Sequence, residues 1–125
     1  MSAKVVHFEV PFDDADRALS FYRDVFEWDI QSMPDMGYNM VSTGPMGNQG
    51  ASEPGYIGGG MLQRQAPVTN PVITLMVDDI DATLVTVEKH GGSAVVAKTA
   101  VGDMGFSAYF RDSEGNLMGL WQNVG

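Results

Sequence analysis

The chain has 125 residues, of which 44% are hydrophobic and 18% are charged, and this balance predicts one globular domain over residues 1–125. The net charge of −9 argues against nucleic-acid and anionic-membrane partners, and the lack of cysteine excludes disulfides, thiolate metal sites and a cysteine nucleophile. Because no apolar run approaches the ~20 residues that span a bilayer and no signal peptide is recognised, we expect a cytoplasmic protein.

Residues 5–10 are rich in β-branched and aromatic side chains, which predicts a first strand that Pro11 ends. Side chains along a strand point alternately to its two faces. One face of this strand is uniformly apolar and carries Val6, Phe8 and Val10. His7 and Glu9 therefore lie on the opposite face, where they are the first candidates for a functional site.

A helix is predicted after the first strand. Asp13 or Asp14 suits its N-cap, because a carboxylate can accept a free backbone N–H of the first turn. Apolar residues then recur at helical spacing and predict one buried stripe, formed by Ala15, Ala18, Leu19, Tyr22, Val25 and Phe26. The apolar face of the first strand is the expected partner of this stripe, so His7 and Glu9 should lie on the side of the sheet away from the helix.

The rest of the first half predicts three further strands, at residues 28–33, 38–43 and 56–63. A glycine-rich stretch, 44–55, is expected to be a long loop of the kind that often serves as a lid or a binding loop. Three successive glycines, at 58–60, indicate a bulge or the close approach of another backbone.

The second half repeats the pattern of the first after a linker at residues 65–71. The acidic pair that starts the first helix returns 65 residues later (78 − 13 = 65), as Asp78 and Asp79. At the same offset, the partner of His7 is Val72. A strand, a helix and three more strands are predicted in this half, at residues 72–77, 79–90, 93–98, 107–111 and 117–122. The chain is thus interpreted as two tandem copies of one structural unit.

Several motifs occur in an order that resembles the vicinal oxygen chelate superfamily, which includes glyoxalase I, bleomycin-resistance proteins and extradiol dioxygenases. They span nearly the whole chain and read His7-Phe8-Glu9-Val10, Phe21-Tyr22-Arg23-Asp24-Val25-Phe26, Val77-Asp78-Asp79-Ile80-Asp81 and Phe110-Arg111-Asp112-Ser113-Glu114-Gly115-Asn116. The resemblance implies an α+β fold of two tandem βαβββ modules, at about residues 4–64 and 71–123, whose curved mixed sheet carries the helices outside. It also implies a homodimer, which would cover exposed strand edges.

In the metal enzymes that the chain resembles, ligands come from the first and last strands of each module. The corresponding positions here are His7 and Val72 on the first strands, and Gly60 or Met61 and Gly119 on the last strands. Since a stable divalent site needs about three N or O ligands and only His7 supplies one, we expect neither a metal nor another cofactor. Glyoxalase I activity is accordingly not expected. A divalent metal held by His7 and Glu9 is the alternative, and the two glycines are expected to leave open space.

Alternation along the strands also predicts the side chains of the concave face. These form the expected ligand pocket and comprise His7, Glu9, Met61, Thr74, Met76, Tyr109 and Trp121. His7 either lines the pocket or is hydrogen-bonded within the sheet. Glu9 is expected to pair with His7, with an arginine or with a cationic ligand, because an isolated buried carboxylate is costly. The candidate arginines are Arg64 and Arg111.

The expected function is the binding of a small organic molecule in this pocket, without the metal site of the enzymes that the chain resembles. The alternative is a lyase- or isomerase-type enzyme, either metal-dependent or with His7 and Glu9 as acid and base. A third interpretation is an interaction module whose aromatic inner face only builds the dimer.

Overall fold

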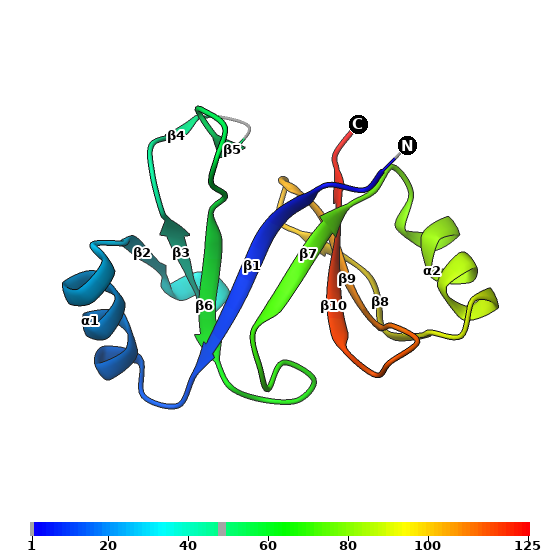
Figure 1. Ribbon diagram of the computed structural model, residues 1–125, viewed down its shortest axis with the longest axis horizontal. Helices are drawn as coiled ribbons and strands as arrows, with labels where there is room; N and C mark the ends of the chain where they lie inside the picture. Colours follow the sequence, from blue (N-terminus) through cyan, green and yellow to red (C-terminus); the bar gives the residue numbers. More distant parts are fainter. Residues whose placement is uncertain (1, 48–49) are drawn as a thin grey trace. The chain divides into compact units, whose positions relative to one another are not determined.

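The computed structural model describes residues 2–47 and 50–125, which form two compact units (Figure 1). The first module comprises Val6–Pro71, and the second comprises Val72–Gly125 together with residues 2–5. Each combines one α-helix with a mixed β-sheet, so the expected α+β class is confirmed. Neither α-helix in the described part of the chain is long and apolar enough to cross a membrane.

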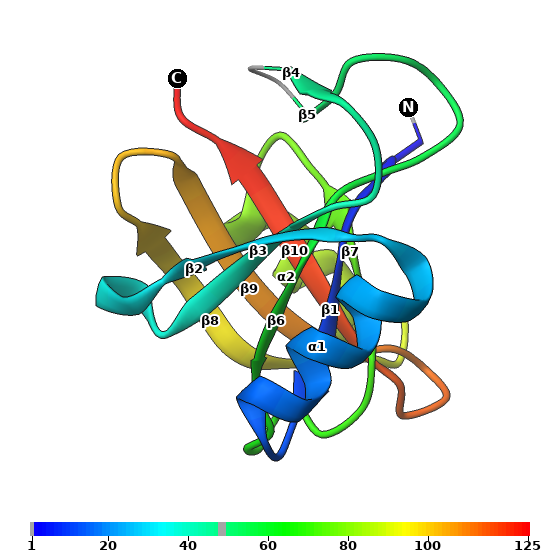
Figure 2. The ribbon, with the colours of Figure 1, turned by 90° about the vertical axis from the view of Figure 1, so that its left-hand side faces the viewer.

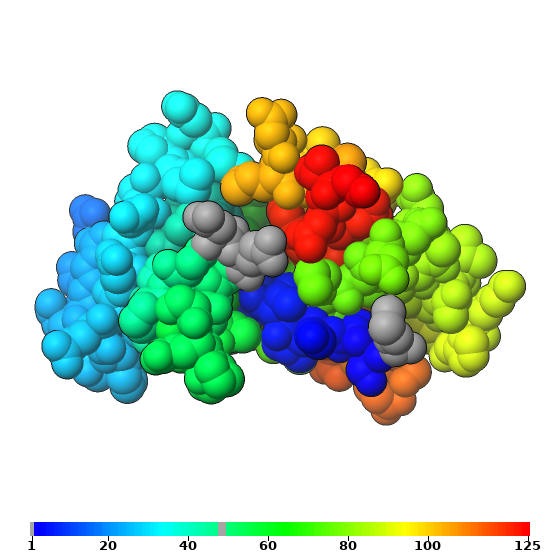
Figure 3. All heavy atoms as spheres, turned by 90° about the horizontal axis from the view of Figure 1, so that it is seen from above, coloured from blue at the N-terminus to red at the C-terminus, as the bar shows by residue number. Residues whose placement is uncertain are grey.

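The first module is built on a sheet with the strand order β2-β3-β6-β1. Its elements are β1 (Val5–Phe12), α1 (Ala15–Phe26), β2 (Asp29–Met33), the 3₁₀ turn η1 (Pro34–Met36), β3 (Tyr38–Ser42), β4 (Met46–Gly47), β5 (Gly50–Ala51) and β6 (Gly59–Gln63). β1 runs parallel to β6, and the other neighbours are antiparallel. The short hairpin β4–β5 lies at the surface of the module, within the stretch predicted to be a long loop (Figure 3).

The second module has the strand order β7-β10-β9-β8. Its elements are β7 (Val72–Met76), α2 (Ile80–Lys89), β8 (Ser93–Val101), β9 (Gly105–Arg111) and β10 (Leu117–Asn123). β7 runs parallel to β10, as β1 does to β6, and the remaining pairs are antiparallel. The two modules therefore share one topology, which confirms the βαβββ order expected from the internal repeat.

Both helices begin directly after the second aspartate of the repeated acidic pair, which is their N-cap. The carboxylate of Asp14 accepts a hydrogen bond from the backbone N–H of Arg17 at 3.1 Å, and that of Asp79 accepts one from Ala82 at 3.1 Å. Each cap satisfies a donor that has no partner inside the helix. α1 ends at Glu27, whose left-handed φ of 57° turns the chain out of the helix.

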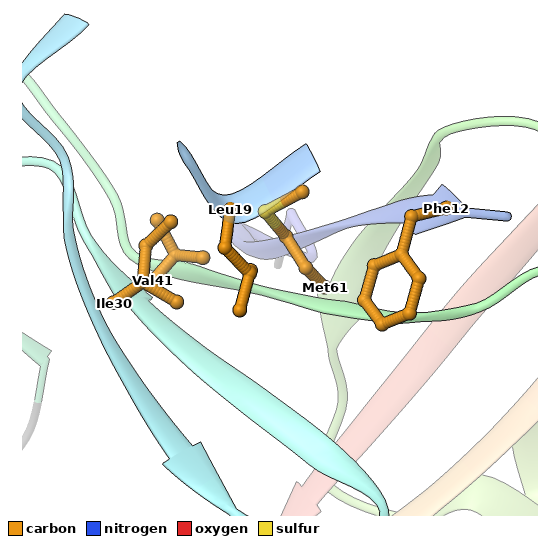
Figure 4. Close-up of a cluster of buried hydrophobic side chains, with 5 residues drawn as sticks. All are labelled: Phe12, Leu19, Ile30, Val41 and Met61. Atoms are coloured by element: carbon orange, nitrogen blue, oxygen red, sulfur yellow. The ribbon is translucent and has the colours of Figure 1, made fainter. Parts of the chain in front are cut away.

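Each module has its own hydrophobic core between its sheet and its helix. α1 lies against one face of the first sheet (Figure 2), and the core there consists of Phe12, Leu19, Ile30, Val41 and Met61 (Figure 4). The core under α2 consists of Ile80, Leu84, Ala108, Phe110 and Leu120. Burial of such side chains stabilises a fold by about 1.5–3 kcal/mol each. One face of each sheet is thus committed to packing, and the opposite face carries the remaining alternate residues.

The predicted buried stripe of α1 packs on the core as far as Tyr22, but the prediction is wrong for Val25 and Phe26 in the last turn. Leu19 is 7% exposed, whereas Val25 and Phe26 in the last turn are 55% and 57% exposed. Tyr22 stacks on Trp28 with ring centroids 4.6 Å apart, and the ring of Phe26 lies 6.0 Å and 6.4 Å from those two. The stacked pair closes the core at this end of the helix, so the outer side of the Phe26 ring meets solvent.

Two consecutive residues of α2 provide a test of this packing. Leu84 is 9% exposed and belongs to the core, whereas Val85 is 56% exposed. Leu84→Ala should lower the free energy of unfolding by about 2–5 kcal/mol, because it removes buried methyl groups and leaves a cavity. Val85→Ala should change it by less than about 0.5 kcal/mol. Urea denaturation of both variants measures the difference, and equal losses would contradict the assignment of the core face.

Candidate functional site

Three polar side chains of the first module are joined by hydrogen bonds on the sheet face opposite α1. His7 and Glu9 come from β1, and Tyr38 comes from the start of β3. The Tyr38 hydroxyl donates to Oε2 of Glu9 at 2.8 Å. The oxygen of this hydroxyl also lies 2.7 Å from Nε2 of His7. The predicted association of His7 with Glu9 is therefore made through a phenol, and we call these three residues the polar trio.

The strand register explains how Tyr38 reaches the two residues of β1. Glu9 is paired with Gly60 between β1 and β6, and Gly60 is paired with Met40 between β6 and β3. A Cβ atom at Gly60 would overlap the phenol of Tyr38, so the ring lies across this glycine. Glycine is needed here because the aromatic ring passes close to the backbone. The expectation that Gly60 leaves open space is wrong, since Tyr38 occupies that space.

Burial governs the electrostatics of the polar trio. Glu9 is 7% exposed, which would be costly for a carboxylate without hydrogen-bond donors. Burial lowers the pKa of the His7 imidazole below its ordinary value of 6.5, and the negative charge of Glu9 opposes this shift. The desolvation of His7 is the larger of the two causes, so His7 is neutral at pH 7. The trio therefore combines a neutral imidazole, a phenol and a buried carboxylate.

The two arginines considered as partners of Glu9 make other contacts. Arg64 forms an ion pair with Asp13, with Nε 2.9 Å from Oδ1, and also donates to the carbonyl oxygen of Thr69. Arg111 donates to the carbonyl oxygen of Gly115 at 3.0 Å and so holds the turn between β9 and β10. Both contacts are exposed, and exposed ion pairs contribute only about 0–1 kcal/mol. We therefore assign both arginines to surface structure.

The second module repeats one part of this arrangement. Thr74 stands 65 residues after Glu9 (74 − 9 = 65) and is also 7% exposed. It is paired with Gly119, as Glu9 is paired with Gly60. A Cβ atom at Gly119 would lie 2.6 Å from Oγ1 of Thr74, so this glycine does not leave open space either. Each module thus holds a buried polar side chain of its first strand beside a glycine of its last strand.

Three further predicted pocket residues share the face of Thr74. Tyr109 is paired with Gly119, and Trp121 is paired with Met76, so all four predicted residues of this module lie opposite the core under α2. Trp121 Nε1 donates to Oδ1 of Asn123 at 2.8 Å, and Asn123 Nδ2 lies 3.4 Å from the sulfur of Met76. The shared face follows from strand alternation, and a role of these residues in ligand binding remains a prediction.

Met61 does not have the position expected of a pocket residue. Its register partner on β1 is Val10, and Val41 is its companion in the core, so it lies on the face that packs against α1. The side chain is 0% exposed. The prediction is wrong by one residue of register, because Gly60 and not Met61 lies opposite Glu9.

The polar trio supplies two side chains of the types that usually bind a divalent metal, His7 and Glu9. Among residues 2–47 and 50–125, no three His, Cys, Asp or Glu side chains converge in a way that could hold an ion. That the protein works without a metal or another cofactor remains a prediction.

A recess of ≈ 320 Å³ lies beside η1 in the same module. Its lining mixes apolar and polar residues: Phe12, Ser32, Met33, Pro34, Gly37, Tyr38, Asn39 and Gln63. Ser32 donates to Oδ1 of Asn39 at 2.8 Å, and Gln63 Nε2 donates to the carbonyl oxygen of Phe12 at 3.2 Å. These polar side chains therefore have hydrogen-bond partners within the protein, and we assign no ligand to the recess.

Tyr38 is the residue that sequence reasoning missed. A tyrosine that opens a strand is ordinary, and its reach to β1 depends on the identity of the strand between them. The available signal was the alternation of β3, which places Tyr38 and Met40 on one face, together with the glycine that faces Glu9 on β6. A long side chain beside a glycine in the neighbouring strand is well placed to cross it.

Comparisons with known proteins agree with this fold. Residues 4–44 match the family described as bleomycin resistance protein-like N-terminal. A Mycobacterium tuberculosis protein that carries the provisional name glyoxylase CFP32 is 28% identical over 110 residues, which cover 87% of this chain. The chain spans 41% of the length of that curated relative.

Two solved structures show the same architecture. A glyoxalase/bleomycin resistance protein/dioxygenase superfamily member from Vibrio splendidus has a TM-score of 0.62 and 15% identity, covering 98% of this chain and 100% of its own. Methylmalonyl-CoA epimerase from Mycobacterium tuberculosis has a TM-score of 0.60 and 16% identity, covering 97% and 88%. These identities establish a common fold and no common activity.

Together with the repeated βαβββ modules, these matches confirm the resemblance. The chain is similar to proteins of the glyoxalase/bleomycin resistance protein/dioxygenase superfamily, which is the vicinal oxygen chelate superfamily, in the family match over residues 4–44 and in its fold. Its own first module joins His7 to Glu9 through a tyrosine.

The contact between Gly60 and Tyr38 can be tested by adding one methyl group. Gly60→Ala should displace the phenol from His7 and Glu9 and lower the free energy of unfolding by about 1–3 kcal/mol. Gly47→Ala is the matched control, because its Cβ would meet other atoms only at 3.7 Å and beyond. Urea denaturation measures both effects. Gly60→Ala in a Tyr38→Ala background should cost less than in the native background, and strictly additive losses would contradict the clash.

The lowered pKa of His7 predicts how stability depends on pH. The imidazole of His7 binds a proton more weakly in the folded state than in the unfolded state, where its pKa is near 6.5. The contribution of His7 is therefore complete above pH 6.5 and is lost as pH falls through that value toward the folded pKa. Urea denaturation between about pH 7.5 and about pH 5.5 should show a steeper acid loss for the native protein than for His7→Gln. Parallel curves for the native protein and His7→Gln would refute the assignment.

Proposed function

We propose that the polar trio of the first module is a binding site for a small organic molecule, and that binding needs no metal. The observation that carries this proposal is the buried Glu9 carboxylate held by Tyr38 and joined through it to a neutral imidazole. A chain that needed only stability could place apolar residues at these positions, because replacing buried polar groups by well-packed apolar ones is often neutral or stabilising. A recognition role accounts for keeping them.

The surroundings of the trio favour an organic ligand with a positive or aromatic part. Met40 lies opposite Gly60 on the same face and is 38% exposed, and the flexible thioether adapts to different apolar shapes. The net charge of −9 raises the local concentration of cations around the protein. Aromatic rings also attract cations. A ligand that combines an organic scaffold with a cationic group is therefore supported best.

An isomerase-type reaction is the second candidate, because a neutral imidazole linked through a phenol to a carboxylate can accept and return a proton. The name of the structural neighbour methylmalonyl-CoA epimerase describes this class of reaction, but at 16% identity the likeness concerns the fold. Proton transfer would be shown by solvent deuterium appearing in a ligand that the protein is found to bind. If His7→Gln still binds the ligand but no longer introduces deuterium into it, His7 takes part in proton transfer and not only in recognition.

The oligomeric state and location belong to the same proposal. We propose a homodimer in the cytoplasm, with no nucleic-acid or membrane partner, on the grounds of the acidic charge and the strand edges at β2 and β8. Light scattering coupled to size-exclusion chromatography measures the mass in solution. A mass equal to one chain across micromolar concentrations would refute the dimer and leave the ligand site untouched.

Ligand binding can be tested with a conservative change of charge. Thermal-shift screening of organic amines and aromatic metabolites should find ligands that raise the melting temperature of the native protein. A ligand at a hundred times its Kd adds about 2.7 kcal/mol to the free energy of unfolding. Glu9→Gln keeps the shape of the side chain and should reduce the affinity for a hit about tenfold, since hydrogen bonds to charged groups contribute about 1.5–3 kcal/mol.

Glu114→Gln is the control, because it makes the same change at an exposed position in the turn between β9 and β10. Its affinity for each hit should equal that of the native protein. A library without any hit, or hits that bind equally well to Glu9→Gln and Glu114→Gln, would overturn the assignment of the trio as the binding site.

A further inference from the structure

The direction of the hydrogen bonds in the polar trio fixes the position of one proton. A tyrosine hydroxyl has a single proton, and Tyr38 donates it to Oε2 of Glu9 at 2.8 Å. The 2.7 Å contact between the Tyr38 oxygen and Nε2 of His7 must then use a lone pair of that oxygen. Nε2 is therefore the donor, and His7 is held as the tautomer whose proton is on Nε2.

The other ring nitrogen of His7 is consequently an acceptor. In a neutral imidazole with its proton on Nε2, Nδ1 carries the lone pair. In the described part of the chain, His7 makes its hydrogen bond through Nε2, and no buried side-chain N or O atom is without a partner. Because Nδ1 takes no protein donor, it is not fully buried and reaches solvent. The trio thus presents one oriented acceptor at its open side.

We propose that Tyr38 is a specificity-determining residue, which fixes the tautomer of His7 so that Nδ1 accepts a hydrogen bond from the ligand. The inference rests on the proposed function and names its ligand class: organic molecules that present an N–H or O–H donor, above all a protonated amine. A carboxylate cannot donate, and its lone pairs would meet the lone pair of Nδ1. The site therefore discriminates in two ways: Nδ1 accepts a hydrogen bond from an amine, and its lone pair repels a carboxylate.

The geometry of the ring supports this orientation. The imidazole of His7 and the phenol of Tyr38 lie with centroids 6.2 Å apart and planes inclined by 18°, so the two rings are nearly parallel while their polar edges meet. Rotation of His7 about its side chain would break the contact between Nε2 and the Tyr38 hydroxyl. The direction of Nδ1 is therefore set by the fold before a ligand arrives, which lowers the entropic cost of binding.

The tautomer is tested without any ligand, by nuclear magnetic resonance of the full chain labelled with ¹⁵N. The native protein should show a slowly exchanging imidazole proton on Nε2 of His7 and an unprotonated Nδ1. Tyr38→Phe should lose the slow exchange of that proton, because its acceptor is removed. Tyr56→Phe is the matched control, since it removes a phenol that donates to the carbonyl oxygen of Pro45 in the same module. A proton on Nδ1 in the native protein, or an unchanged Nε2 signal in Tyr38→Phe, would overturn the inference.

The ligand class is tested with matched probes by calorimetric titration. Phenethylamine and phenylpropanoate share an aromatic ring on a short chain and differ in the charged group. The native protein should bind the amine at least about tenfold more tightly, the effect of one hydrogen bond to a charged group. Tyr38→Phe should reduce this preference, and Tyr56→Phe should preserve it.

The outcomes separate the two levels of the proposal. Equal affinity for the amine and the carboxylate would overturn the specificity assigned to Tyr38 while leaving ligand binding in place. Failure of the native protein to bind any probe or any member of the screening library would overturn the proposed function, and with it this inference, whatever the tautomer of His7.

Discussion

The structure of the first module depends on the burial of one carboxylate. Glu9 lies in the middle of β1 with 7% of its surface exposed, and a charge in that position needs donors within the fold. Tyr38 supplies one from β3, and the path between the strands is open only because β6 contributes Gly60. This contact needs the register of the three strands, the length of the tyrosine side chain and a residue without a Cβ atom at position 60. The same contact orients His7, so the need of Glu9 for a hydrogen-bond donor also determines how the site is arranged.

The two modules show how one topology accommodates different polar content. Both place a helix on one face of a sheet, start that helix with an aspartate cap and pair the first strand in parallel with the last. Both also hold a buried polar side chain beside a glycine, as Glu9 with Gly60 and Thr74 with Gly119. The threonine is neutral, whereas the glutamate accepts a hydrogen bond from a phenol. The first copy therefore holds a carboxylate where the second holds a hydroxyl, while the packing is common to both.

Much of the fold could be predicted from the sequence, because periodicity and capping act over short distances. The aspartate pairs, repeated at an offset of 65, located both helices, and β-branched and aromatic runs located the principal strands. The exposure of Phe26 was missed, since helical spacing shows which residues share a face but not where the underlying sheet ends. Met61 was placed on the wrong face because a single residue of register reverses every side chain of a strand.

The candidate site was predictable at β1 and hidden beyond it. Alternation placed His7 and Glu9 together, and the charge of Glu9 required a partner. The identity of that partner depended on which strand lies next but one to β1, and this order is a tertiary property that local patterns do not carry. Tyr38 was therefore outside the reach of sequence reasoning until the order β3-β6-β1 was known.

The crossing of Tyr38 over Gly60 also constrains how this sequence can change. The two positions are coupled: a side chain at 60 would displace the tyrosine at 38, and a shorter residue at 38 would remove the hydrogen bond from Tyr38 to the carboxylate of Glu9. A side chain at position 60 is therefore expected to be tolerated best where Tyr38 has already been replaced, and a replacement of Tyr38 where residue 9 is already neutral.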